Sequence, residues 1–120
     1  MNDPVTSPAD EQVPDENGET GYVATGFAPC EKPERYIQQV VSHWSHKMAT
    51  SYDKDSGMGV FPFSEVTNAV MTAREGGIGL TLTTADRDEN ERMRGVIERH
   101  IDRFAFREAP LSYEWKEQQQ

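Results

Sequence analysis

Two stretches of the chain repeat their apolar residues at the spacing of an amphipathic helix. In the first stretch, Pro33–Met48, the apolar stripe is formed by Ile37, Val40, Val41, Trp44 and Met48. In the second stretch, Asp86–Glu108, it is formed by Met93, Val96, Ile97, His100, Ile101 and Phe104. A proline suits the first turn of a helix, and the spacing of Asp86 and Glu89 is typical of a capping box. The pattern therefore predicts one helix over each stretch.

Between the two predicted helices the pattern changes to short segments that are rich in β-branched and aromatic residues. Turn residues separate four such segments, at 49–54, 58–64, 66–73 and 79–84. Pro62 removes one ladder donor, which indicates an edge strand or a bulge. After the second helix, Leu111–Trp115 alternates apolar and polar residues and predicts a terminal strand.

The order α-β-β-β-β-α-β predicts an α+β fold. We expect an antiparallel sheet of four to five strands with both helices packed on one face. The predicted elements form a single domain over residues 31–117.

The first thirty residues differ from the rest of the chain in composition. They hold six acidic residues and no Lys or Arg, together with several prolines and glycines. Such a segment buries too little apolar surface to offset the entropy of ordering it. We therefore expect residues 1–30 to form a disordered acidic tail.

Charge and apolar content limit the partners that the chain can have. The formal net charge is −9, so repulsion from phosphates argues against nucleic-acid binding. No apolar run approaches the roughly 20 residues that span a bilayer, and the N-terminus lacks the pattern of a signal peptide. The single cysteine, Cys30, excludes an intramolecular disulfide. These features predict a cytoplasmic protein.

The three histidines are the candidate metal ligands. His43 and His46 are three residues apart on the first helix, a spacing that lets two imidazoles share an iron or zinc ion or a haem. The alternative is favourable charge at the end of that helix. Helical geometry directs His46 away from the apolar stripe and leaves His43 on its flank.

His100 lies within the apolar stripe of the second helix. A buried neutral histidine with a hydrogen-bond partner is one interpretation of this position, and a ligand is the other. A site that His43 and His100 share at the seam between the helices remains open, whereas a centre of all three histidines is not expected.

Arg99, Arg103 and Arg107 are spaced four residues apart on the second predicted helix. Three guanidinium groups in this arrangement form a strip that suits a carboxylate or a phosphate. The alternative is a solvated face in which the arginines pair with neighbouring acids. The aromatic residues likewise fit either a core or a ligand pocket, and Trp115 on a terminal strand fits pairing between subunits.

The residues between Glu34 and Trp115 resemble the bacterial family catalogued as domain of unknown function 2218. The resemblance rests on Tyr36, the segment Ser42–Lys47, Phe61-Pro62-Phe63, and the segment from Arg99 to Glu108. It implies no established activity. The occurrence of the family near genes for siderophore uptake and reduction implies a link to iron acquisition.

We therefore expect a binding or accessory domain without a catalytic motif, linked to iron or siderophore handling. The alternative is a metal- or haem-dependent enzyme that uses His43 and His46. Partners open to such a domain are another protein, a small acidic ligand or a second copy in a homodimer.

Overall fold

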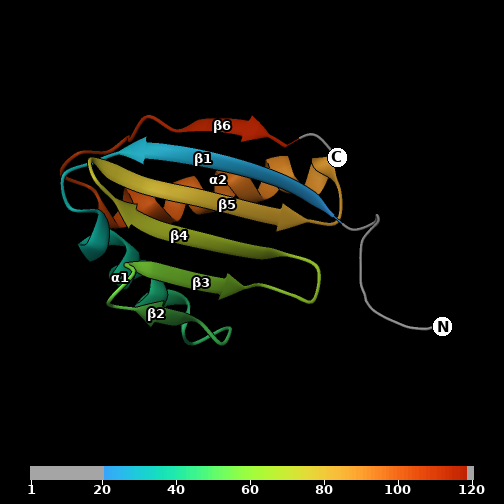
Figure 1. The fold of residues 1–120 in the computed structure, drawn as a ribbon, viewed down its shortest axis with the longest axis horizontal. Coiled ribbons are helices and arrows are strands. Elements are labelled where there is room, and N and C mark those ends of the chain that lie inside the picture. The colour runs from blue at the N-terminus through green and yellow to red at the C-terminus, as the bar shows by residue number, and fades with distance from the viewer. Residues whose placement is uncertain (1–20, 119–120) are drawn as a thin grey trace.

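The computed structural model describes residues 21–118 and shows an α+β fold. Two helices cover one face of a six-stranded antiparallel sheet (Figure 1). In chain order the elements are β1 (Tyr22–Pro29), α1 (Pro33–Trp44), β2 (Ser51–Asp53), β3 (Met58–Pro62), β4 (Asn68–Arg74), β5 (Gly77–Thr84), α2 (Arg87–Phe104) and β6 (Glu114–Glu117). The predicted fold class is confirmed, but the sheet has six strands instead of four to five.

The order of the strands across the sheet is β2-β3-β4-β5-β1-β6. Strands β2 to β5 follow one another as antiparallel neighbours, and β1 then lies between β5 and β6 (Figure 1). The first and the last strand of the described residues therefore pair with each other in the sheet. Because β1 pairs with strands on both sides, it is an interior strand.

The prediction of a disordered tail was wrong for residues 22–30. Tyr22–Pro29 pairs along its whole length with Gly77–Thr84, and Ala24, Ala28 and Cys30 are buried. The domain therefore begins before residue 31. The part of the predicted tail at 1–20 lies outside the described residues.

Alternation along the strands places one row of side chains against the helices. Phe61, Ala69, Leu82 and Ala24 pair across four neighbouring strands and are all buried. The core that they share with the helices is one cluster, and the helices contribute chiefly Ile37, Val40, Trp44, Met93, Ile97 and Ile101. Trp115 packs on the helix-facing side of the sheet as well. Its ring covers Gly26 so closely that a Cβ added to this glycine would lie 3.0 Å from the ring. The core therefore lies between the sheet and the two helices.

Both helices end before the residue that the apolar pattern indicated. α1 ends at Trp44 instead of Met48, and Ser45 Oγ donates a hydrogen bond to the carbonyl of Ser42 at that end. α2 ends at Phe104 instead of Glu108, since the chain turns there and carries Glu108 back to the start of α1. Both predicted ranges ran too far because the turns after the helices also hold apolar side chains, among them the buried Ala105.

The turn predictions are confirmed at two glycines. Gly57 follows the tip between β2 and β3, and Gly76 lies in the turn between β4 and β5, with positive φ values of 69° and 85°. Pro62 is the last residue of β3, two residues beyond the point where pairing with β2 ends. The absence of an N–H at Pro62 therefore removes no hydrogen bond to β2.

No helix within residues 21–118 is both long enough and apolar enough to cross a membrane.

The start of α2 has a side-chain cap, as the sequence predicts. Asp86 Oδ1 accepts a hydrogen bond of 2.9 Å from the backbone N–H of Glu89. We expect Asp86→Ala to lower the free energy of unfolding by about 1 kcal/mol, because one backbone N–H of the first turn loses its side-chain acceptor. Urea denaturation measures this change. Asp88→Ala is the matched control, since it removes the same charge from the same turn without removing a cap and should cost only a few tenths of a kcal/mol, about what the helix dipole contributes. Equal losses in the two variants would contradict the assignment of the cap.

Candidate functional site: a histidine pair between the helices

The packing of α1 against α2 brings two of the three histidines together. His43 lies in the last turn of α1, and His100 lies about one turn before the end of α2. Their ring centroids are 5.3 Å apart, and both side chains are partly buried. Sequence spacing suggested a pair of His43 with His46, whereas His43 makes its ring contact with His100.

Aromatic rings hold the two imidazoles in place. The ring of Trp44 lies 4.4 Å from that of His100 and packs edge-on against Phe61 and Phe63 on the sheet side. The ring of Phe104 lies 5.7 Å from that of His43. Because Trp44 and Phe61 are buried in the core, the position of the pair is fixed by the packing of the domain.

A hydrogen bond determines which nitrogen of His100 carries the proton. Nδ1 of His100 lies 2.7 Å from the carbonyl oxygen of Val96. A carbonyl can only accept, so Nδ1 is the donor and the neutral ring keeps a free lone pair on Nε2. Metal-binding histidines are oriented in the same way, by a hydrogen bond from one ring nitrogen to a carbonyl oxygen while the other nitrogen binds the metal.

The surroundings of His43 favour its neutral form. Partial burial lowers the pKa of His43, and the positive charge of Arg103, together with the repulsion that a second proton-bearing ring at His100 would exert, lowers it further. Lys47 and His46 act in the same direction. His43 is therefore a neutral base near pH 7, which is the form that binds a metal ion.

His46 lies past the end of α1 and is exposed, as the helical geometry of the sequence indicated. Within residues 21–118, no cluster of three or more His, Cys, Asp or Glu side chains is arranged to hold a metal ion. The histidine pair therefore offers two protein ligands at most from this set of side chains.

The three arginines predicted as a strip are all exposed, but they do not continue along one helix. Arg103 lies over the ring of Phe104, with its guanidinium carbon 5.8 Å from the centroid, close to His43. Arg107 lies beyond the last residue of α2, over the exposed ring of Phe106. Only Arg99 and Arg103 remain on the helix, so the end of α2 separates Arg107 from the strip.

Sequence reasoning missed a second group of polar residues, at the junction between the start of α1 and the end of α2. The hydroxyl of Tyr36 donates to Oε2 of Glu108 over 2.6 Å, and the backbone N–H of Glu31 donates to the same carboxylate. This hydrogen bond raises the pKa of Tyr36 to about 12, so the hydroxyl stays protonated. More than seventy residues separate Tyr36 from Glu108, and no local pattern reports such a contact.

Cys30 lies near this junction and is buried. Burial and the nearby charge of Glu108 raise the pKa of its thiol to about 11. The thiol therefore stays protonated at neutral pH.

Comparison with known proteins places the chain among bacterial proteins of uncharacterised function. The family model described as "Uncharacterized protein conserved in bacteria (DUF2218)" matches residues 25–116, a range that includes most of β1. No curated protein matches the chain. The NMR structure of PA4090 from Pseudomonas aeruginosa has a similar fold, with a TM-score of 0.65 and 23% identity over 79% of this chain and 95% of that one. The family match covers most of the sequence, from the second half of β1 to β6, and the chain therefore belongs to the DUF2218 family of bacteria.

Proposed function

We propose that this domain is a binding module that holds a transition-metal ion, free or within a chelate, between His43 and His100. The observation that carries the proposal is the pairing of the two rings across the helix seam. A metal–nitrogen bond of about 2.1 Å puts each ring centroid roughly 3.2 Å from the ion, so two imidazoles in a tetrahedral site have centroids about 5.2 Å apart. The separation of 5.3 Å between His43 and His100 agrees with this value.

The state of the two imidazoles supports the same function. His100 has a free Nε2 because its Nδ1 donates to Val96, and the lowered pKa keeps His43 neutral. Two protein ligands leave several positions of an ion open, which suits an ion that arrives with its own chelator. Imidazole ligands accept iron and zinc, and haem iron also takes axial histidines. Iron within a siderophore or a haem is the ligand that the iron-related gene context of the family favours.

Titration calorimetry of the full-length protein with Zn²⁺, and with Fe²⁺ in the absence of oxygen, tests the proposal. Absorption spectra recorded as haem is added test whether haem binds. We expect one ion per chain and at least about tenfold weaker binding in His43→Ala and in His100→Ala, since even groups that only orient a ligand contribute that much. Lowering the pH should weaken binding, because protonation of the ligand imidazoles competes with the ion, and the lowered pKa of His43 moves its own part of this competition to more acidic solution.

His46→Ala is the matched control, because it removes an exposed histidine two residues from the end of α1. It should bind the ion as the unaltered protein does. Loss of binding in His46→Ala with full binding in His100→Ala would instead support a site at His43 and His46, and with it the metal-dependent enzyme. Circular dichroism of each variant confirms that the fold is intact.

A further inference from the structure

We infer that a cleft between the start of α1 and the end of α2 binds a small aromatic carboxylate. We call it the α1–α2 cleft; Lys32, Arg35 and Arg107 supply its cations, and Tyr36, Phe104 and Phe106 supply its rings. Its volume is about 430 Å³, within the roughly 300–1,000 Å³ of small-molecule sites. It is distinct from the histidine pair, although Phe104 contacts both.

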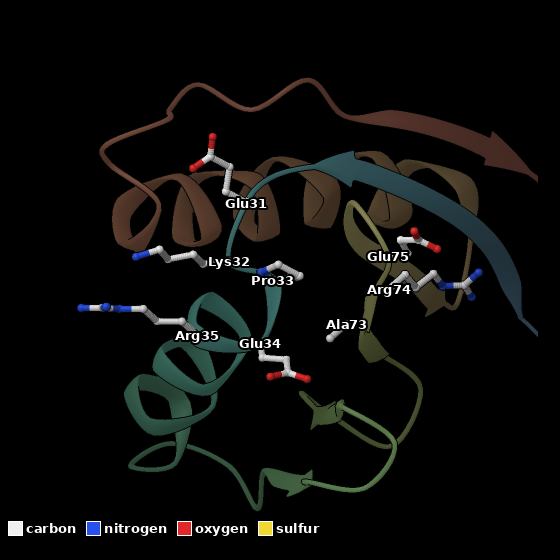
Figure 2. A pocket seen from close by; sticks show the side chains of 8 residues that line it. All are labelled: Glu31, Lys32, Pro33, Glu34, Arg35, Ala73, Arg74 and Glu75. Atoms are coloured by element: carbon white, nitrogen blue, oxygen red, sulfur yellow. The ribbon is translucent and has the colours of Figure 1, made fainter.

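Three cationic side chains converge on this cleft from two helices. Lys32 and Arg35 leave the first turn of α1 in the same direction, away from the β4–β5 turn that carries Arg74 (Figure 2). Arg107, which follows the end of α2, also lines the cleft. Among residues 21–118, no carboxylate lies within ion-pair distance of any of the three. Within this part of the chain, no ion pair competes with a ligand for these three charges.

The acidic residues of the cleft do not cancel this field. Glu108 already accepts hydrogen bonds from Tyr36 and from the backbone of Glu31, so its carboxylate holds the two helices together at this junction. The cleft has three cationic side chains and two carboxylates, those of Glu31 and Glu108, so its net charge is positive. The net charge of the whole protein, by contrast, is −9. The helix dipole adds to the field, since the first turn of α1 has no side-chain cap.

The aromatic side chains of the cleft indicate which group the ligand carries besides its negative charge. Phe106 is 70% exposed, and it lies beside Phe104 in the lining of the cleft. The guanidinium of Arg107 lies 5.7 Å from the centroid of the Phe106 ring, so cation and ring present one surface. An aromatic ring that carries a carboxylate would cover the phenylalanine and pair with the arginines at once. The cleft is too small for a polyanion, and the acidic protein repels one.

Benzoate is the probe for this inference, titrated into the metal-free full-length protein by calorimetry. We expect saturable binding at one site, about tenfold weaker or more in Arg35→Ala and in Arg107→Ala, because each removes a charged partner of the carboxylate. Arg99→Ala is the matched control, since it removes an exposed arginine of α2 that does not line the cleft, and it should leave binding unchanged. Phe106→Ala should also weaken binding.

Two further probes separate the ring from the charge. Benzyl alcohol has the ring without the carboxylate, and inorganic phosphate has charge without the ring; each should bind at least about tenfold more weakly than benzoate. The inference would be overturned by any one of three results: no saturable benzoate binding, benzoate binding in Arg35→Ala and Arg107→Ala that is as tight as in the unaltered protein, or phosphate that binds as well as benzoate. None of these results depends on the histidine pair, because no metal is present in the experiment.

Discussion

Removal of residues 1–30 is expected to abolish cooperative folding of the domain. The deletion takes away β1, which pairs with β5 along eight residues and with β6 along four. It also removes Ala24, Ala28 and Cys30 from the core and leaves two strands with unpaired edges. A domain of this size has a net stability of about 5–15 kcal/mol, which the loss of an interior strand exceeds. Thermal unfolding by circular dichroism and the dispersion of amide NMR signals measure the result.

A shorter deletion is the control. Removal of residues 1–20 takes away all six acidic residues of the predicted tail but none of the six strands. We expect this variant to unfold cooperatively. A variant without residues 1–30 that keeps the same melting temperature would show that β1 is dispensable and would contradict the topology.

The largest effect of a single substitution is expected at Phe61. Its side chain is fully buried on the helix-facing side of β3, and its ring packs edge-on against Trp44 at 5.5 Å. Phe61→Ala should lower the free energy of unfolding by about 3–5 kcal/mol, because it removes apolar contacts and leaves a cavity that the sheet cannot fill. Urea denaturation with tryptophan fluorescence measures the loss.

Phe106→Ala removes the same side chain from a position that is 70% exposed. Its cost should stay within about 0.5 kcal/mol, since no core contact is lost. Equal costs at the two positions would contradict the assignment of Phe61 to the core. Because Trp44 also packs on His100, Phe61→Ala should in addition weaken metal binding at the histidine pair, whereas Phe106→Ala should not.

The sequence predicted the helices and most strands because their apolar residues repeat with a clear period. It missed β1 because the helix-facing residues of that strand are small. Ala24, Gly26 and Ala28 give little apolar signal, and Gly26 is small because the ring of Trp115 covers it. The β-formers of the strand, Val23 and Phe27, were outweighed by the acidic composition of the residues before them. The overall composition of the first thirty residues therefore hid the signal of the eight-residue strand β1.

The candidate site was only partly predictable for a different reason. Residue spacing within one helix favours partners such as His43 and His46, whereas contacts between helices depend on how the helices cross. The position of His100 opposite His43 follows from the packing of Trp44 and Phe104, which the sequence alone does not specify. The α1–α2 cleft depends on where α2 ends, and the predicted helix, which ran to Glu108, placed that end four residues too late.

The central claim is that His43 and His100 act together as ligands. Correlation of ring nitrogens with ring protons by NMR, recorded as Zn²⁺ is added to the ¹⁵N-labelled full-length protein, follows each histidine separately. The account predicts that a nitrogen of His43 and Nε2 of His100 shift together with one midpoint, while Nδ1 of His100 keeps its proton and its bond to Val96. The signals of His46 should not change. Shifts of His43 together with His46 while His100 stays unchanged, or no shifts at all, would contradict the account.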